Sequence, residues 1–269
     1  MEKTILLTGA TDGIGLETAK MLARENHNLI LHGRNLDKLD RVVSDLQGKA
    51  KIDKCVADLS DLKEVSALAD TLANRYNAID VVINNAGVFR TPAPRTDSGL
   101  DIRFVVNTLA PYVLTCRLET RLGTSSRIVN VASAAQAPVE IDALEGRTAL
   151  TDNAAYAQSK LALMMWTYSL AQENDGNGPI MVSVNPASLL GSKMVKEAYG
   201  MDGGDLGIGA DILFRAALSD EFADASGRYY DNDRKAFGDP HPDVFDDAKL
   251  SAVMASMNEL AKEHLPVSE

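Results

Sequence analysis

The stretch at residues 4–15 constrains the fold of this chain more than any other. An aliphatic run at 5–7 is followed at once by Gly9, Gly13 and Gly15. Such a run, bounded by glycine, is typical of a buried strand in a parallel sheet, and the residues after the last glycine repeat their apolar side chains at helical spacing. A strand, a glycine turn and a helix together point a helix N-terminus at a phosphate group. The spacing G-x-x-x-G-x-G is not the general dinucleotide fingerprint, so an ordinary glycine loop is the plain alternative.

The same alternation of strand and helix continues along the chain. The sequence predicts strands at 4–8, 28–32, 51–56, 79–84, 127–132, 180–185 and 227–230. Helical patterns separate them at 14–25, 36–47, 61–75, 99–121, 153–173 and 206–219. This order predicts an α/β fold, a doubly wound parallel sheet of about seven strands with helices on both faces. Because no linker or repeat divides the chain, we expect one domain over residues 1–269.

Composition excludes several classes of function. The net charge is −11, whereas binding to nucleic acid needs a basic face, so we expect no nucleic-acid partner. Cys55 and Cys116 lack metal-ligand spacing and are expected to be reduced core thiols, with no metal site. The chain shows no charged-then-apolar leader and no apolar stretch long enough for a membrane span. We therefore expect a cytoplasmic protein without a membrane partner.

Two stretches break the alternating pattern, at 134–152 and 187–206. Neither has clear periodicity, and each follows a predicted strand. Long loops at the carboxyl ends of parallel strands are where such sheets bind ligands. We expect both loops to line a substrate pocket.

The end of the second predicted strand indicates which dinucleotide binds. Proteins that bind NAD on this kind of sheet place an acid there to hold the ribose 2′-hydroxyl. This chain instead has Gly33 and Arg34, and a guanidinium suits a 2′-phosphate that a carboxylate would repel. The pair predicts NADP(H) rather than NAD, with an ordinary surface arginine as the alternative. Lys38 lies one helical turn further on, and His32 is expected to be a packed strand residue rather than a catalyst.

Polar residues also end the third and fourth predicted strands. Asp58-Leu59 stands where a short acid can accept a hydrogen bond from an adenine amino group. The alternative is a helix N-cap, for which Asp58, Ser60 and Asp61 are all suitable. The run Asn-Asn-Ala-Gly at 84–87 offers amides that can fix loop backbone and a glycine that lets a ligand lie close.

One pair of residues in the predicted helix at 153–173 carries proton-transfer chemistry. Tyr156 and Lys160 are four apart and so share one helical face. A nearby ammonium lowers the pKa of a phenol, which is otherwise near 10, so the pair can exchange a proton with an alcohol oxygen. Ser133, at the end of the fifth predicted strand, is placed to form a hydrogen bond with the same oxygen. Asn107 is placed to form a polar kink in its helix or to hold a water. Y-x-x-x-K alone is common by chance.

Together these motifs resemble the short-chain dehydrogenase/reductase family. They occur in family order over residues 4 to about 190: Thr8-Gly9-Ala10, Gly13-Ile14-Gly15, Asp58-Leu59, Asn84-Asn85-Ala86-Gly87, Asn107, Ser133, Tyr156 and Lys160. The resemblance implies a Rossmann-like sheet, a nicotinamide cofactor and a catalytic tetrad of Asn107, Ser133, Tyr156 and Lys160. The cofactor contacts that it implies are Gly9, Thr11, Asp12, Gly13, Ile14, Gly15, Arg34, Asp58, Leu59, Asn85, Ala86, Gly87, Tyr156, Lys160, Pro186 and Ala187. The wide gap between Ser133 and Tyr156 and the strand at 227–230 are similar to the retinol dehydrogenase-like branch.

The chain departs from the family pattern at three places. Pro186-Ala187 replaces the usual Pro-Gly, which is compatible with the same backbone only if φ at the alanine is negative. Ala132 replaces the first serine of a usual pair. Ala110-Pro111 stands where relatives often have glycine, and a proline within a helical run predicts a kink.

The sequence thus predicts an NADP(H)-dependent oxidoreductase that interconverts a small-molecule carbonyl and an alcohol. A cofactor-sensing regulatory protein on the same fold is the alternative, because fold does not imply function. A reductase of carbon–carbon double bonds ranks lower, because those relatives usually space the tyrosine and lysine more widely. A homo-oligomer is left open: Met164, Met165 and Trp166 face either a partner helix or the core.

Overall fold

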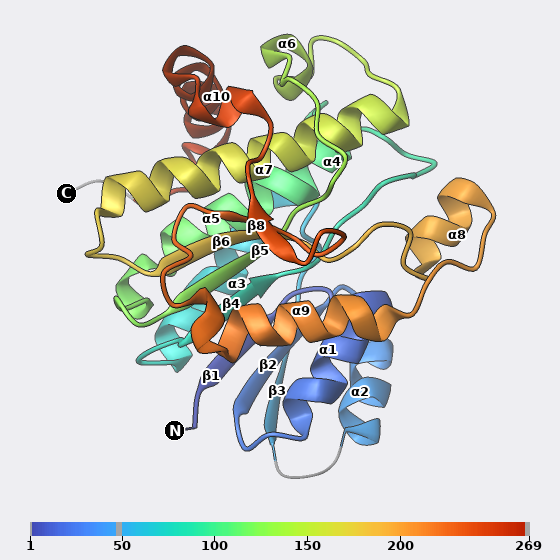
Figure 1. Cartoon of the computed structure of the whole chain (residues 1–269), viewed down its shortest axis with the longest axis vertical. Helices are drawn as coiled ribbons and strands as arrows, with labels where there is room; N and C mark the ends of the chain where they lie inside the picture. Colours follow the sequence, from blue (N-terminus) through green and yellow to red (C-terminus); the bar gives the residue numbers. More distant parts are fainter. Residues whose placement is uncertain (1, 47–49, 267–269) are drawn as a thin grey trace.

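The computed structural model describes residues 2–46 and 50–266 and forms one α/β domain built on an eight-stranded sheet (Figure 1). The last residue of the predicted helix at 36–47 and both ends of the predicted domain lie outside the described residues. The strands are β1 (Thr4–Leu7), β2 (Asn28–Gly33), β3 (Lys51–Val56), β4 (Val81–Asn84), β5 (Arg127–Val131), β6 (Ile180–Asn185), β7 (Tyr229–Asp231) and β8 (Ala236–Gly238). Their order is β3-β2-β1-β4-β5-β6-β7-β8, and the first seven in sequence are parallel. The chain order reverses between β1 and β4, so the carboxyl ends of these two strands form the switch point where such sheets bind ligands.

The edge of the sheet differs from the prediction. β8 pairs antiparallel with β7, and the predicted strand at 227–230 begins only at Tyr229, because Gly227 turns the chain with φ +74°. Phe237 of β8 packs against Tyr230 in β7, with Arg228 over its ring at 4.0 Å. These contacts between side chains from the two strands stabilise a pairing of only three residues each.

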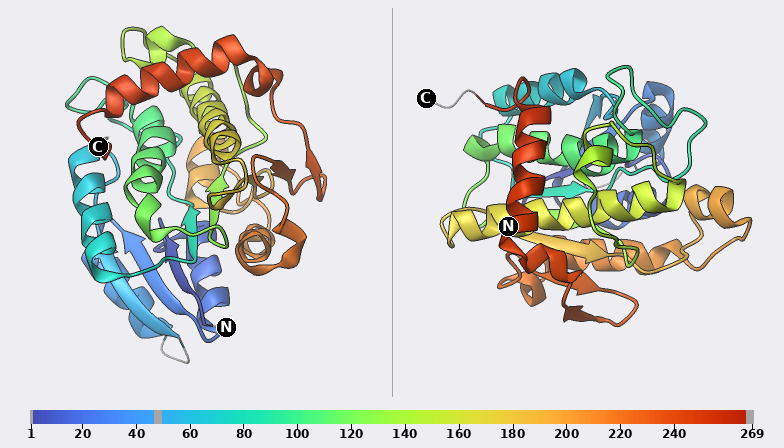
Figure 2. Two further views of the ribbon diagram at one scale, coloured as in Figure 1. Left: turned by 90° about the vertical axis from the view of Figure 1, so that its left-hand side faces the viewer. Right: turned by 90° about the horizontal axis from the view of Figure 1, so that it is seen from above.

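The strands are apolar on both sides because both sides are covered. In β1, Leu6 belongs to the core on one face, while Ile5 and Leu7 belong to the core on the other, and all three are fully buried. Helices α1 (Gly13–Ala23), α2 (Leu36–Asp45) and α9 (Leu206–Leu218) cover the second of these faces. Helices α3 (Leu62–Arg75), α5 (Ala110–Arg117) and α7 (Asp152–Asn174) cover the first (Figures 1 and 2).

The helix predicted at 99–121 is broken into several parts. A short α4 (Ile102–Phe104) runs into a π-helical turn, η1 (Val105–Leu109), and then into α5; η2 (Glu119–Arg121) follows. Pro111, at the start of α5, has no N–H to donate to the carbonyl four residues earlier, which belongs to Asn107. The predicted kink therefore lies in the turn before the proline, and it centres on Asn107.

Several helices were not predicted. Two of them, α6 (Ile141–Leu144) and α8 (Lys193–Tyr199), lie within the stretches expected to be loops. Further along the chain are η3 (Asp220–Phe222), η4 (Pro242–Phe245) and α10 (Asp247–Ala261).

Helix α10 lies across the outer side of α5 and α7 (Figure 2). The Tyr112 hydroxyl of α5 donates to Asn258 Oδ1 at 2.6 Å, and Met257 of α10 joins the same core cluster as Trp166. The sequence left open whether Met164, Met165 and Trp166 face a partner helix or the core. The structure buries all three within the chain, so they face the core. Over the described ranges, no helix is both long and apolar enough to cross a membrane.

Candidate active site

The glycine loop between β1 and α1 is held by the end of β4, its neighbour in the sheet. The Asn85 side-chain amide donates to the carbonyl oxygens of Thr8 and Gly9, at 2.9 and 3.2 Å. The Thr8 hydroxyl in turn accepts from the backbone N–H groups of Asn85 and Ala86, at 3.0 and 3.1 Å. The structure thus places Asn85 and Ala86 against the predicted loop, with the Asn85 amide fixing its backbone.

Two positions of the loop require glycine, because neighbouring backbone lies too close to leave room for a side chain. Gly9 has φ +67°, and a Cβ there would lie 2.9 Å from Ala86 Cα. A Cβ on Gly15 would lie 2.2 Å from the Gly9 carbonyl oxygen. Any side chain at either position would push the loop away from β4, so these glycines have a structural reason besides any ligand.

The N-terminus of α1 suits a phosphate group. Helix α1 begins at Gly13, and the carboxylate of Asp12, its N-cap residue, accepts from the Gly13 N–H at 2.7 Å. An anionic group therefore already lies where the unpaired N–H groups and the helix dipole attract negative charge. Ile14 and Thr11 flank this turn and are half-buried. The residues present fit a dinucleotide phosphate at this position.

His32 contacts the glycine loop from the neighbouring strand β2. Its side chain is 2% exposed, its Nδ1 accepts from the Gly9 N–H at 3.3 Å, and its Nε2 lies 3.0 Å from the Ala57 carbonyl oxygen. Burial lowers the pKa of His32, which favours the neutral ring that this arrangement needs. His32 is thus a packed strand residue, as expected, but its contact with Gly9 was not foreseen because the two are distant in sequence.

Arg34 lies beside the glycine loop at the end of β2. A Cβ on the preceding Gly33 would lie 2.7 Å from Thr11 Cγ2, so the two turns touch. Arg34 is exposed, and the Asn35 side chain caps α2 through the N–H of Lys38 at 2.9 Å. The structure therefore places the main chain at Arg34 next to the glycine loop, and binding of a 2′-phosphate by Arg34 stays a prediction.

Asp58 and Leu59 have other partners. The Asp58 carboxylate accepts from the N–H and the hydroxyl of Ser60, at 2.9 and 2.7 Å, while Asp61 is the N-cap of α3. The Leu59 side chain is buried in the core under α3. The Asp58 N–H also donates to the Glu64 carboxylate at 2.6 Å, so Asp58 is engaged within the protein, and its predicted contact with adenine stays untested.

Lys160 lies buried at the end of β5. The residue is 4% exposed, and its ammonium donates to the Val131 carbonyl at 2.6 Å and lies 5.8 Å from the centre of the Tyr156 ring. Burial lowers the pKa of Lys160 to about 8. A Cβ on Gly87 would lie 3.7 Å from the ammonium and 3.3 Å from Asn107 Oδ1, so Gly87 lies beside both of these groups. The pair predicted at spacing four therefore shares one face of α7, on which Lys160 is buried and Tyr156 is half-buried.

Asn107 connects the π-turn to the loop after β4. Its amide accepts from the Val88 N–H at 2.8 Å and donates to the Val88 carbonyl and to the Ser159 hydroxyl, at 3.0 and 2.9 Å. The side chain is thus engaged in the protein, and Ser159 is a neighbour that sequence reasoning missed. The main-chain carbonyl of Asn107 has no α-helical hydrogen-bond donor, because Pro111, four residues later, has no N–H.

Ser133 follows β5 directly and is half-buried. Its hydroxyl accepts from the Ala135 N–H at 3.1 Å, and its carbonyl accepts from the Tyr229 hydroxyl at 3.4 Å. Phe89 packs against Tyr156 with ring centroids 4.7 Å apart. The structure therefore brings the four predicted tetrad positions to one edge of the sheet, and it adds Phe89, whose place in a loop gave no sequence signal.

The loop after β6 corrects one expectation. Ala187 has φ +114°, not the negative value under which an alanine fits without strain. The next residue is held in place: the Ser188 N–H donates to Asp233 at 2.8 Å, and Asn232 donates to the Pro186 carbonyl at 3.0 Å. Burial alone would raise the pKa of Asp233, but hydrogen bonds from Ser188 and from a neighbouring asparagine hold that pKa below its usual value. The β7–β8 hairpin therefore maintains an unfavourable backbone at Ala187.

The two stretches expected to line a substrate pocket lie at the same edge. The insert at 134–152 is tied to α7, because Gln158 donates to the Glu140 carboxylate at 2.9 Å and accepts from the Glu140 N–H at 3.0 Å. The stretch at 187–206 passes over the glycine loop, where a Cβ on Gly13 would lie 3.6 Å from Ser192.

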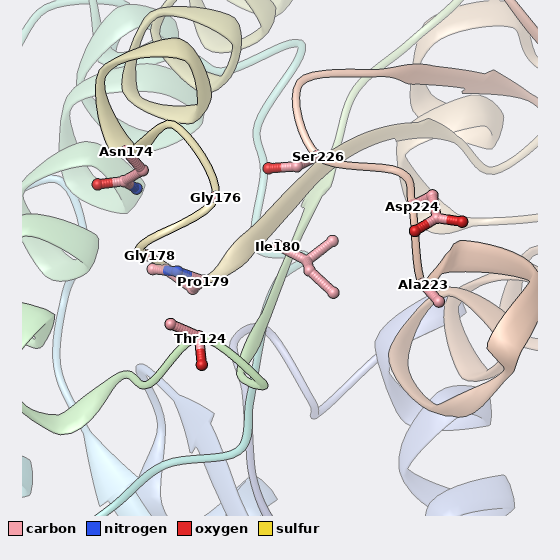
Figure 3. A pocket seen from close by; sticks show the side chains of 9 residues that line it. All are labelled: Thr124, Asn174, Gly176, Gly178, Pro179, Ile180, Ala223, Asp224 and Ser226. Atoms are coloured by element: carbon pink, nitrogen blue, oxygen red, sulfur yellow. The ribbon is translucent and has the colours of Figure 1, made fainter.

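A hollow of about 330 Å³ lies at the opposite edge (Figure 3). Thr124, Pro179 and Ser226 line it, at the amino ends of β5, β6 and β7. It carries none of the predicted site residues. Among residues 2–46 and 50–266, no cluster of three or more His, Cys, Asp or Glu side chains is arranged to hold a metal ion.

Comparison with known proteins gives relatives along most of the chain. The family model for short chain dehydrogenases matches residues 3–202, which include the glycine loop and all four tetrad positions. Human retinol dehydrogenase 13 is 32% identical over 251 residues, covering 85% of this chain and 76% of that protein. The short-chain dehydrogenase chyC of Penicillium rubens is 29% identical over 271 residues, covering 97% of this chain and 98% of that protein.

Solved structures show the same architecture. An uncharacterized protein from Mycobacterium paratuberculosis matches with a TM-score of 0.80 at 26% identity, covering 98% of this chain and 95% of that one. A short chain dehydrogenase from Shigella flexneri, solved as a complex with NADP, matches with a TM-score of 0.69 at 25% identity, covering 86% of this chain and 97% of that one.

Proposed function

The chain belongs to the short-chain dehydrogenase/reductase family, in its retinol dehydrogenase-like branch, and on that basis we propose that it is an NADP(H)-dependent oxidoreductase that interconverts a carbonyl and an alcohol. The observation that carries the proposal is the buried Lys160 ammonium beside Tyr156, at the same sheet edge as the glycine loop. Among the residues that the structure describes, no carboxylate pairs with Lys160; burying such a lysine is costly, and a role in proton transfer accounts for it.

The cofactor, when bound, supplies the hydride. The N-terminus of α1 would hold its phosphates, Arg34 its 2′-phosphate, and Lys160 its nicotinamide ribose. The protein contributes position and electrostatics, as in other enzymes whose cofactor performs the difficult chemistry.

Tyr156 is the proposed general acid in reduction and the general base in oxidation. The Lys160 ammonium, held where water is excluded, stabilises the phenolate and so lowers the cost of moving that proton. Ser133 donates a hydrogen bond that orients the substrate oxygen. The Asn107 main-chain carbonyl, left without an α-helical donor by Pro111, is suited to hold a water that resupplies the proton.

The proposed preference for NADP(H) depends on Arg34. Losing one charge-assisted hydrogen bond costs about 1.5–3 kcal/mol, roughly ten- to a hundred-fold in affinity. Arg34→Ala should weaken NADPH binding by that factor and leave NADH binding nearly unchanged, as measured by fluorescence titration of both cofactors. Gly33 is a poor site for introducing an acid, because its Cβ would meet Thr11. If the wild-type protein binds NADH as tightly as NADPH, Arg34 does not select the 2′-phosphate and the proposed preference is wrong.

The proposed reaction is tested by a screen followed by one substitution. Oxidation of NADPH is measured against a panel of ketones, aldehydes and quinones, and the best substrate is then used for kinetics. Tyr156→Phe removes one hydroxyl and should lower kcat by at least ~10²-fold, the lower end of what general acid catalysis contributes, while NADPH affinity stays within a few-fold. Tyr168→Phe, further along the same helix and packed on Phe245, is the matched control and should keep full turnover.

Two results would contradict the proposal. Full turnover in Tyr156→Phe would exclude Tyr156 from the mechanism. Tight NADPH binding with no turnover across the whole panel would favour the cofactor-sensing alternative instead.

A further inference from the structure

Arg103 is a buried cation that the proposed reaction does not use. It lies at the start of α4 and its side chain is 1% exposed. Its Nε and Nη2 atoms donate to the two carboxylate oxygens of Asp101, at 2.7 and 2.6 Å, in a bidentate pair. Its Nη1 atom donates to the carboxylate of Asp152 and to the Phe89 carbonyl, the latter at 3.5 Å. One side chain therefore joins three segments that are distant in sequence.

Two of those segments are close neighbours of Tyr156. Asp152 is the first residue of α7, one helical turn before Tyr156. Phe89 packs its ring on that of Tyr156, 4.7 Å between centroids and tilted by 49°. The phenol ring thus lies between two elements that a single guanidinium connects.

The neighbouring turn strengthens this connection. Arg103 and Asn107 are four apart and hold consecutive residues of the loop after β4. Arg103 bonds the main chain of Phe89, and Asn107 bonds the main chain of Val88 at both its N–H and its carbonyl. The hydrogen bonds that Arg103 donates to Asp101 in particular hold the pKa of Arg103 above its usual value, so the guanidinium stays charged in its buried position.

We propose that Arg103 is a positioning residue for the proton-transfer step: it fixes the first turn of α7 against Phe89 and so fixes the place of the Tyr156 ring. The inference depends on the proposed function, because Arg103 acts through Tyr156. Lysine cannot take its place, since an ammonium lacks the planar fork that bonds Asp101 by two atoms and still reaches Asp152. A small displacement of a reacting group is enough to cost about 10²-fold in rate.

A buried arginine also contributes to stability, so the test needs a matched control. Arg117 in α5 makes the same kind of contacts: two of its guanidinium nitrogens bond Asp70, and the third donates to the His264 carbonyl at 2.9 Å. Arg117→Lys therefore perturbs the same kind of hydrogen bonds at a more exposed place, and the partners that the structure describes for Arg117 lie outside α7 and Phe89.

The experiment compares Arg103→Lys, Arg117→Lys and wild type in the full chain. Hydrogen–deuterium exchange is followed in peptides covering 86–92 and 152–158, beside kcat, NADPH affinity and the melting temperature. We expect Arg103→Lys to exchange faster in both peptides and to lower kcat by roughly 10²-fold, with NADPH affinity within two-fold. Arg117→Lys should lower the melting temperature less, because its partner Asp70 is exposed, and should leave both peptides and kcat unchanged.

Asp152→Ala provides a gentler variant in case Arg103→Lys does not fold. The Asp152 side chain is 44% exposed, so its loss removes the link between α7 and Arg103 without opening the core. It should speed exchange in 152–158 and lower kcat several-fold. Unchanged exchange in that peptide, or a kcat equal to that of Arg117→Lys, would overturn the inference. If wild type turns over no carbonyl, the proposed function fails, but the exchange measurement still decides whether Arg103 holds α7.

Discussion

Replacing Ala187 by glycine should make the protein more stable. Ala187 has φ +114°, whereas the other described non-glycine residues at positive φ, Asp175, Leu189 and Lys235, lie between +42° and +53°, in the left-handed well. A residue in a sparsely populated region costs about 1–3 kcal/mol. Glycine avoids that cost but loses about 0.5–1 kcal/mol through the greater freedom of the unfolded chain. The net gain is roughly 1 kcal/mol, a rise of about 2–3 °C in melting temperature for a chain of this size.

Thermal and urea unfolding of Ala187→Gly measure this gain, and Ala223→Gly is the control. Ala223 is exposed and has φ −61°, so glycine there brings only the entropic loss and should lower stability by about 0.5–1 kcal/mol. A fall in stability for Ala187→Gly equal to that of Ala223→Gly would refute the strain argument.

The same strain predicts a coupling to Asp233. In Asp233→Ala the loop loses the bond from the Ser188 N–H and is free to relax at Ala187. The gain from Ala187→Gly should then disappear, which a double-mutant cycle detects as an interaction energy of roughly 1 kcal/mol. Additive effects would show that the hairpin does not maintain the unusual backbone.

The remaining predictions concern α7. The pKa of Lys160 is about 8 in the folded protein and 10.5 in the unfolded chain, so the unfolded state binds more protons between these values, and stability should rise with pH through that window by about 3 kcal/mol. Lys160→Met should lose that rise, and urea unfolding at pH 7, 8, 9 and 10 checks it; the same slope in both proteins would contradict the assigned pKa. Gln158→Ala should free the insert from Glu140 and raise KM for the carbonyl substrate while NADPH affinity stays constant. A parallel loss of NADPH binding would show instead that the insert braces the fold.

The parts of the site that were predictable are those with local signals. The glycine turn, the spacing of Tyr156 and Lys160, and Ser133 directly after an apolar strand can each be read within a few residues. Parallel strands then bring such places to one edge, whatever their distance in sequence. The geometry of a parallel sheet, together with the motifs, therefore made it predictable that these residues meet at one edge.

The parts that were missed depend on contacts between distant residues. Arg103 and Asp152 are 49 positions apart, and Ser188 and Asp233 are 45 apart, so no local pattern links them. Strand β8 is only three residues long and has too few positions to show alternation. Such features are decided by tertiary packing, which overrides local propensity.

Helix α10 is a different case, because its signal was present. Val253, Met254, Met257 and Ala261 recur at helical spacing and are the buried residues of that helix that join the core. Asp246 directly precedes the helix and caps the N–H groups of Ala248 and Lys249.

The position of α10 also limits how copies of this protein can meet. Large apolar patches on a monomer tend to drive self-association or aggregation. Here the outer flank of α5 and α7 is covered by α10, so an approaching copy encounters the solvent-facing side of α10 rather than Trp166 and its neighbours. An assembly that keeps α10 in place therefore cannot bury Trp166 and its neighbours between two copies, and displacing α10 would expose an apolar surface that promotes association.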